Sequence, residues 1–350
     1  MSTKAGQCPR VLVVGDWDAD GIIASAEILF AQETARAFPV KGAKCTPELR
    51  PSSPRNIGDV LKDPCWDYLV ILDIPFTPEV EQALDSVVSN GCRPKIYYFD
   101  HHKVTIEKSP YIESKYSAVA FVGISPTSVL VKVFLESMGV KLTPRLKDLV
   151  SSAAVLEGGG WLSRNNRGAT EGMIKLAASM SKTINQSKNP DLWLKYVRWA
   201  SNVLPFDVSA VIPRSEDLIS KGLEVSERSD KEIKDVAMQL ALSAKNVGFV
   251  KFVDARGKWN KSGASALASA IYKITKATTA LLVSKDDGSD LLIIRSGHGE
   301  AIRLAEELLR IGAIEDVGGH ENIASGRVKK GLSINELEDL IRKASIKSIK

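Results

Sequence analysis

The sequence lacks the features of a membrane protein, a secreted protein or a strongly basic nucleic-acid-binding protein. No apolar run reaches the ~18 residues that a membrane-spanning helix needs, and the N-terminus has no signal-peptide pattern. The formal net charge is only +5, which permits nucleic-acid binding without requiring it. We find no internal repeat and no low-complexity tail. These absences predict a cytoplasmic protein that has no membrane partner.

Cysteine is also scarce, and its spacing does not suggest a metal site. The four cysteines, all in the first hundred residues, are Cys8, Cys45, Cys65 and Cys92. We expect buried or free thiols in a reducing cytoplasm. The 350 residues, 44% hydrophobic and 25% charged, are ordinary for a globular protein and sufficient for two domains with their own cores.

The most informative stretch is VLVVGDWDADGIIASAE, residues 11–27, in which three aspartates alternate after a short apolar run. Asp16, Asp18 and Asp20 place hard oxygen ligands where a strand is expected to end, and Gly21 is expected to let the chain turn. Carboxylates crowded in this way repel one another unless a cation neutralises them. The stretch therefore predicts a metal site, of which two kinds fit.

The first kind is a calcium loop. The pattern D-x-[DN]-x-[DN]-G-x5-E is satisfied in full, ending at Glu27. Such a loop needs a helix on each side. The preceding VLVV is instead β-branched and typical of a buried strand, and the chain contains no second loop of this kind. These observations count against calcium.

The second kind is a strand-to-helix turn at the carboxyl edge of an α/β sheet, where such folds bind ligands. It requires further ligands at the ends of later strands, and the sequence supplies them. DYLVILDIPF carries Asp73 near its end, and KIYYFDHHKV runs into Asp100, His101 and His102. Three successive strand-like runs that end in such residues favour this second interpretation.

The order of elements predicts an α/β protein, with a mostly parallel sheet covered by helices on both faces and a smaller α/β domain at the C-terminus. Residues 10 to about 200 alternate strand-like and helical patterns. A polar helical stretch follows, and then a second set of strands and helices. We predict a metal-binding domain over 1–205, a helical connector over 206–245 and a C-terminal domain over 246–350.

GDWDADG, LDI and FDHH resemble the first three motifs of the DHH phosphoesterase superfamily. VGGHENIASG resembles the GGH-x-x-A-A-G signature of its associated C-terminal domain, although Ile323 takes an alanine's place and Gly326 falls one position late. Within the superfamily, the chain looks most like archaeal RecJ-type proteins, which include single-strand exonucleases and replisome factors. The resemblance spans nearly the whole chain.

This resemblance implies a centre for two divalent ions, because two ions can hold a phosphodiester and activate water. Carboxylates with an imidazole suit Mn²⁺, with Mg²⁺ as an alternative. Asp18 would then serve one ion and Asp20 the other, while Asp73 would bridge them and His101 would complete the second site. Asp16 would be a ligand or lie close behind one.

The resemblance also assigns roles to the rest of the third motif and shows one departure. Asp100 would orient an imidazole through its ring N–H, and His102 would face the phosphate. The fourth motif of active relatives contains an aspartate, but here SSAAVLEGGGWLSRNNRG has a glycine at that position. Glu157, one position earlier, is a candidate replacement ligand.

The C-terminal domain is expected to hold nucleic acid. Gly318 and Gly319 would let the backbone approach a phosphate, to which His320 would donate. Arg295 and Ser296, at the end of an expected strand, would bind the same nucleic-acid strand, and the basic Arg327 follows the motif.

Three functions remain open on this sequence. The first is a Mn²⁺-dependent phosphodiesterase that trims single-stranded DNA or RNA from one end. The second is a weakly active or inactive replisome scaffold that binds single strands, the GINS complex and the replicative helicase. The third is a small-nucleotide phosphodiesterase. The choice between the first function and the second depends on whether catalysis survives the loss of the fourth-motif aspartate.

Overall fold

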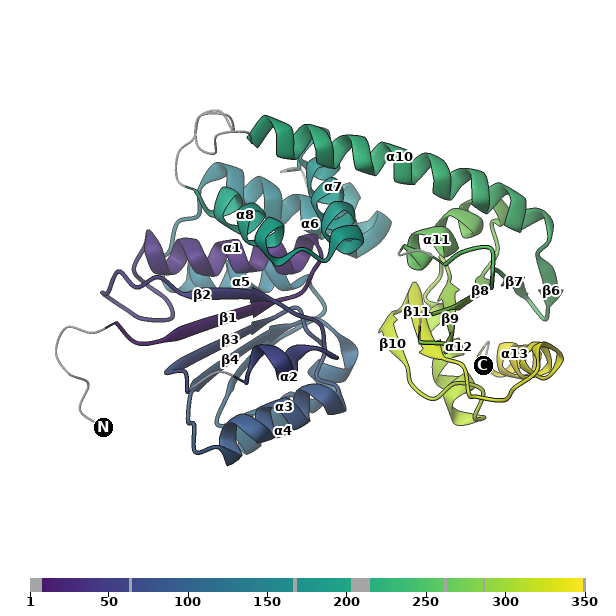
Figure 1. The fold of residues 1–350 in the computed structure, drawn as a ribbon, viewed down its shortest axis with the longest axis horizontal. Helices are drawn as coiled ribbons and strands as arrows, with labels where there is room; N and C mark the ends of the chain where they lie inside the picture. The colour runs from purple at the N-terminus through teal and green to yellow at the C-terminus, as the bar shows by residue number, and fades with distance from the viewer. Residues whose placement is uncertain are drawn as a thin grey trace. The chain divides into compact units, whose positions relative to one another are not determined.

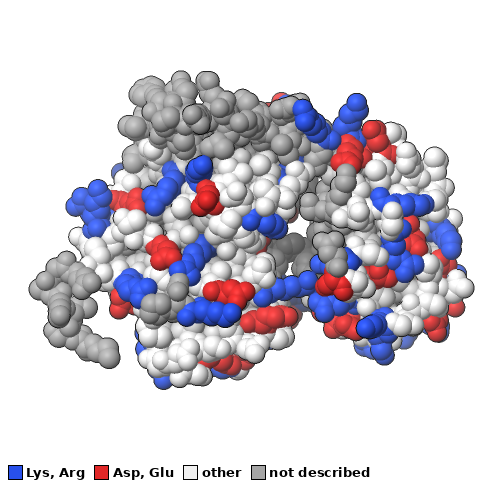
Figure 2. Space-filling model, in the orientation of Figure 1, with Lys and Arg blue, Asp and Glu red and all other residues white. Residues whose placement is uncertain are grey.

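The computed structural model describes residues 8–62, 65–165, 169–202, 215–260, 263–285 and 287–348. The chain divides into two compact units, Met1–Ser226 and Glu227–Lys350. The division falls within α10 (Ser215–Leu242), and so inside the connector predicted over 206–245. No helix among the described residues is long and apolar enough to cross a membrane. On the face drawn in Figure 2, basic and acidic side chains are interspersed, in keeping with the small net charge.

The first unit is built on a five-stranded sheet in the order β2-β1-β3-β4-β5, and every neighbouring pair is parallel. The strands are β1 (Val11–Gly15), β2 (Glu48–Pro51), β3 (Tyr68–Leu72), β4 (Lys95–Asp100) and β5 (Val119–Val122). Because β1 lies between β2 and β3, the strand order reverses there. Ligands of such sheets bind outside the carboxyl ends of the strands at this reversal.

Helices cover both faces of this sheet, as Figure 1 shows. One face carries α1 (Ala19–Glu33), α5 (Thr127–Ser137), α6 (Pro144–Asn165), α7 (Glu171–Ser187) and α8 (Pro190–Ser201). The other carries α2 (Ile57–Val60), α3 (Pro78–Ser89) and α4 (Lys103–Tyr116). Successive residues of β1 enter opposite cores, since Val11 and Val13 pack with α1 while Leu12 and Val14 pack with α3. The predicted α/β fold is confirmed.

The second unit is a six-stranded mixed sheet in the order β10-β11-β9-β8-β7-β6, in which only β7 and β8 are parallel. Its strands are β6 (Lys245–Val247), β7 (Val250–Asp254), β8 (Thr279–Ser284), β9 (Asp290–Arg295), β10 (Gly318–His320) and β11 (Ile323–Arg327). α12 (Glu300–Arg310) and α13 (Ile334–Ser348) pack on one face. α11 (Ala264–Thr275) and the end of α10 pack on the other.

The expectation of free thiols is wrong, because the structure pairs all four cysteines. The disulfides are Cys8–Cys45, with Cα atoms 5.6 Å apart, and Cys65–Cys92, with Cα atoms 5.2 Å apart. Each cysteine lies three residues before the start of a strand. Cys8 precedes β1, Cys45 precedes β2, Cys65 precedes β3 and Cys92 precedes β4. β1 pairs with β2 and β3 with β4, so parallel pairing brings the cysteines together at the amino edge of the sheet. Sequence spacing does not reveal this proximity, and the cytoplasmic location stays a prediction.

Gly21 does not turn the chain but allows a close approach. It is the third residue of α1, and a Cβ added there would lie 2.6 Å from both the backbone nitrogen and the backbone oxygen of Asp16. The glycine thus lets the first turn of α1 pack directly on the residue that follows β1. This contact helps to set the position of Asp16.

Glu27 excludes the calcium-loop interpretation and is itself unusual. It lies inside α1, fully buried, and neither carboxylate oxygen has a hydrogen-bond partner among the described residues. A strand, β1, precedes the aspartates where a calcium loop needs a helix. Burial, and then the negative charge of Asp20, raise the pKa of Glu27 well above its usual value. Burial in the core therefore favours the neutral form of this carboxyl group.

We predict that Gly21→Ala destabilises the first unit by about 1–3 kcal/mol, because the added methyl group overlaps backbone that cannot move freely. The matched control is Gly172→Ala in α7, where an added Cβ meets no atom within 4 Å. That substitution is expected to be neutral or to stabilise by about 0.5 kcal/mol. Thermal and denaturant unfolding of both variants measures the difference. Equal effects would contradict the close approach.

We predict that Glu27→Gln stabilises the protein increasingly as pH rises from 5 to 8. The unfolded glutamate ionises with its ordinary pKa near 4.5, whereas the folded one resists ionisation. The contribution of Glu27 to wild-type stability therefore falls with pH, by up to about 1.4 kcal/mol per pH unit, until the folded pKa is reached. The midpoint of thermal unfolding, measured for both proteins across this range, reports the change. A difference between them that does not vary with pH would show that Glu27 ionises normally.

Candidate metal centre

Residues that can bind a metal lie at the carboxyl ends of three neighbouring strands, β1, β3 and β4. They are Asp16 after β1, Asp73 after β3, and Asp100, His101 and His102 at and after the end of β4. The apolar residues of these strands are buried in the two cores, so the first polar residues after them are delivered to the same edge. The sheet therefore brings together side chains that are up to 86 positions apart in the chain.

Asp73 is the most constrained of these residues. Its backbone has φ +60°, in the left-handed region, and its N–H donates to the carbonyl of Phe99 at 3.0 Å. The side chain is 4% exposed. Its Oδ1 accepts a hydrogen bond from the Thr127 hydroxyl at 2.9 Å and lies 3.3 Å from His101 Nε2. A non-glycine residue in this conformation costs free energy, and such strain is common where a side chain must be aimed at a site.

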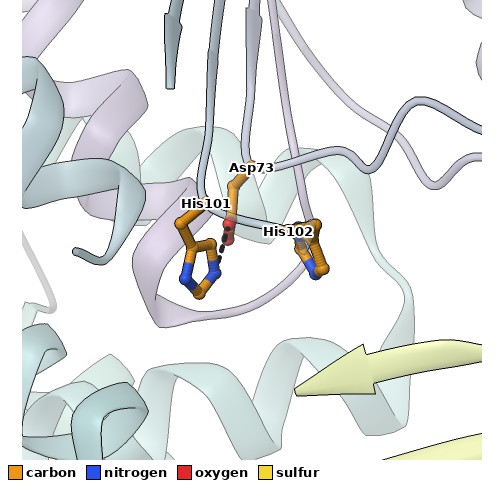
Figure 3. Close-up of side chains that lie close together, drawn as sticks. All are labelled: Asp73, His101 and His102. Atoms are coloured by element: carbon orange, nitrogen blue, oxygen red, sulfur yellow. Dashed lines mark ion pairs between the residues drawn. The ribbon is translucent and has the colours of Figure 1, made fainter. Parts of the chain in front are cut away.

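Asp73 belongs to two groups of potential ligands. In one, its carboxylate lies with His101 and His102, as Figure 3 shows. In the other, it lies with Asp16 and Asp18. Within each group, the ligand atoms are all within 4.8 Å of one another. A mixed carboxylate and imidazole set suits Mn²⁺, and a carboxylate set suits Mg²⁺ or Mn²⁺.

The electrostatics of these carboxylates fit a bound cation. Burial, followed by the charge of Asp18, raises the pKa of Asp16 to about 7. Burial, followed by the charge of Asp20, raises the pKa of Asp73 well above its usual value. Like charges in a desolvated site favour protonation. A divalent cation would reverse both shifts, because it stabilises the ionised form of each ligand.

His102 and Asp100 form a buried pair next to this cluster. His102 Nδ1 lies 2.8 Å from Asp100 Oδ1, and Asp100 is fully buried. Burial alone would lower the pKa of His102, but Asp100 outweighs it and raises that pKa to about 9. Burial alone would also raise the pKa of Asp100, but the charge of His102 and its hydrogen bond hold it below its usual value. The resemblance implies such a contact for Asp100, and the role of the pair in binding a phosphate stays a prediction.

Asp18 and Asp20 both make helix-capping contacts. Asp18 Oδ1 accepts from the N–H of Gly21 at 3.0 Å, as the N-cap of α1. Asp20 is fully buried and accepts from the N–H of Thr127 at 2.6 Å and from the N–H of Ser128 at 3.1 Å. The Ser128 hydroxyl also donates to it. Asp18 belongs to a ligand group and Asp20 to neither, so Asp20 as a metal ligand stays a prediction.

Glu157, on α6, is influenced by the negative charge of the acidic cluster. Desolvation, followed by the negative charges of Asp18 and Asp20, raises its pKa, although the residue as a whole is exposed. It is not a member of either ligand group. Its role as a replacement for the fourth-motif aspartate stays a prediction, and the side chains of residues 158–168 lie outside those described.

Sequence reasoning missed the residues that hold this cluster in place. Thr127 and Ser128, at the start of α5, satisfy oxygens of Asp73 and Asp20. Trp193, fully buried on α8, donates from Nε1 to the backbone carbonyl of Asp16 at 2.9 Å. The Pro-Thr-Ser that starts α5 was a helix-start signal. Nothing in the sequence pairs it with aspartates that lie 54 and 107 positions away.

In the second unit, predicted nucleic-acid-binding residues make contacts within the unit itself. Arg295 donates from a guanidinium nitrogen to the carbonyl of Asn322 at 2.8 Å. Ser296 is fully buried and lies just before α12, where its Oγ accepts from the N–H of Glu300 at 3.3 Å. Gly319 has φ +126°, and a Cβ there would lie 2.3 Å from the Ile323 carbonyl oxygen.

The remaining predicted residues of that unit are Gly318, His320 and Arg327. Gly318 and His320 lie on β10, and the His320 side chain is outside those described. Arg327 ends β11, and its guanidinium lies 3.9 Å from Asp316. Nucleic-acid binding by these residues stays a prediction.

No protein-family model matches the chain, and no curated protein matches it. Solved structures do match. A DHH domain described as a member of the s1p family of ribosomal proteins has a TM-score of 0.70 at 16% identity, over 96% of this chain and 87% of that one. RecJ from Thermus thermophilus, in complex with Mn²⁺, has a TM-score of 0.64 at 15% identity, over 97% of this chain and 52% of that one.

A third match is PggH from Vibrio cholerae, a pGpG-specific phosphodiesterase, with a TM-score of 0.57 at 10% identity. It covers 96% of this chain and 99% of the PggH chain. These matches extend over nearly the whole chain and include both units. The chain therefore has the fold of the DHH-domain proteins, the superfamily whose motifs its sequence resembles.

Proposed function

We propose that the protein is a metal-dependent phosphodiesterase of the RecJ type that acts on single-stranded DNA or RNA. The observation that carries this proposal is the position of Asp73, whose buried carboxylate is shared by two groups of potential ligands. A shared carboxylate is what a two-metal hydrolase needs, because one ligand can then hold both ions close together.

The residues present fit Mn²⁺, with Mg²⁺ as an alternative. Asp73, Asp16 and Asp18 would hold one ion, and Asp73 with His101 the other. When bound, such ions hold the phosphate, lower the pKa of water and offset charge on the leaving oxygen. The RecJ structures similar to this chain include complexes with Mn²⁺ and with Mg²⁺.

His102 and Asp100 would act on the substrate. Asp100 holds the Nδ1–H of His102 through the contact at 2.8 Å and fixes the orientation of the ring. We assign the other ring nitrogen, Nε2, to a nonbridging phosphate oxygen, to which it would donate a hydrogen bond. Charge would build up on that oxygen during hydrolysis, so a donor placed there stabilises the transition state.

The second unit would hold the nucleic-acid strand. The left-handed backbone of Gly319 and the arginines Arg295 and Arg327 are suited to phosphate contacts. The net charge of +5 is compatible with such binding. PggH, with a comparable fold, acts on a dinucleotide, so a short oligonucleotide is the alternative substrate.

A second candidate function is a replisome scaffold with little hydrolysis, bound to the GINS complex and the replicative helicase. The observation that favours it is the state of Asp20, whose two oxygens accept three hydrogen bonds from the start of α5. These hydrogen bonds occupy lone pairs of Asp20 that would otherwise bind a metal ion. Together with the glycine in the fourth motif, they would weaken the binding of an ion. One experiment separates the two functions.

We predict that the protein degrades end-labelled single-stranded DNA, RNA or pGpG in Mn²⁺, and that Asp73→Asn lowers the rate at least about 100-fold, since it removes the shared ligand. Asp59→Asn, an exposed aspartate of α2 paired with Lys62, is the matched control and should keep full activity. The label position gives the polarity of degradation.

Equal rates in the wild type and Asp73→Asn would assign the activity to a contaminant and contradict the proposed centre. Binding of single strands without turnover by the wild type would instead favour the scaffold. Co-purification of GINS subunits with the tagged chain would then be expected, and its absence would count against that second function.

A further inference from the structure

Lys188 brings a positive charge to the acidic side of the proposed metal centre. It follows α7, in the turn before α8, and has φ +44°, in the left-handed region that lysine seldom adopts. Its ammonium donates to Asn185 Oδ1 at 2.8 Å and lies 5.2 Å from the ring centroid of Trp17. Lys188 is an exposed residue, and the hydrogen bond and the cation–π contact favour this position of its side chain.

The position of Trp17 makes this contact informative. Trp17 stands between Asp16 and Asp18 in the chain, and its side chain is 9% exposed. The ammonium is therefore held next to the segment of the chain that carries both aspartates. The helix that follows Lys188, α8, also contacts this segment. Its Trp193, five residues after Lys188, donates to the backbone carbonyl of Asp16 at 2.9 Å.

The charges around this position are unbalanced. Asp16 and Asp18 both interact with Lys188, and each stabilises its charged form against the desolvation that lowers its pKa. His102 also lowers the pKa of Asp16, but it is already paired with Asp100. Among the described residues, Lys188 is thus a cation that interacts with both Asp16 and Asp18.

We propose that Lys188 competes with a divalent cation for Asp16 and Asp18, so that the protein binds one ion tightly, at Asp73 and His101, and a second one weakly. This inference rests on the proposed metal centre. It specifies which of the two ions in that centre is bound less tightly. It makes Lys188 a positioning residue that controls metal stoichiometry rather than a group that touches the reacting atoms.

The physical reason is electrostatic. An ammonium near two carboxylates neutralises part of their charge, and it also repels a doubly charged ion that approaches the same oxygens. Removing the ammonium should therefore tighten the second ion by about ten-fold, which is the size expected for one unit charge acting on a divalent ion through partly solvated surroundings. The ion at His101 should change much less.

The test measures Mn²⁺ binding by the full chain at fixed pH. Electron paramagnetic resonance quantifies free Mn²⁺, and titration calorimetry gives the affinity and the number of ions bound. We expect one tight ion per chain in the wild type. Lys188→Met should show two, with the second about ten-fold tighter than in the wild type. Lys188→Arg keeps the charge and should resemble the wild type. Lys195→Met, which removes an exposed lysine of α8, is the control for loss of charge in general.

Two tight ions in the wild type, or an unchanged second affinity in Lys188→Met, would overturn the role of Lys188 and leave the metal centre intact. No Mn²⁺ binding by any of these proteins would overturn the centre itself, and this inference with it. Because the experiment measures metal binding alone, its result does not depend on whether the protein hydrolyses nucleic acid.

Discussion

The crowding of carboxylates at one edge of a parallel sheet is the constraint on which the rest of this protein depends. Asp16, Asp18 and Asp73 bring ligand oxygens within 4.8 Å of one another. Asp73 is buried, and Asp16 and Asp18 are half-buried, so water screens this cluster less than it would at the surface. Such an arrangement is costly without a cation. The fold must hold the side chains there against their mutual repulsion, and several elements are used for that purpose.

The supporting contacts come from helices on one face of the sheet. The start of α5 presents N–H groups and hydroxyls to Asp20 and Asp73, where the positive end of the helix dipole favours negative charge. α8 fixes the backbone of Asp16 through Trp193, and α1 packs on it through Gly21. At the opposite edge, the disulfides tie β1 to β2 and β3 to β4. The strands that carry the centre are therefore held at both ends.

The sequence was sufficient for the fold class and for the strand ends. Short apolar runs that end in Asp16, Asp73 and Asp100 imply parallel strands whose carboxyl ends meet, because helices alternate with them. It was not sufficient for contacts set by tertiary packing. The engagement of Asp20 by Ser128, the pairing of the cysteines and the approach of Lys188 to Trp17 all join positions whose proximity depends on how helices pack on the sheet.

In the proposed centre, Asp73 and its neighbours bind a divalent metal ion. Anomalous diffraction from crystals grown with Mn²⁺, recorded at the manganese absorption edge, tests it without relying on catalysis. We expect an anomalous peak within about 2.0–2.4 Å of an Asp73 oxygen and of a nitrogen of His101, the range of metal–ligand distances for such donors. An anomalous map that shows fully occupied Mn²⁺ sites elsewhere on the protein, but no peak at Asp73, would contradict the proposed centre.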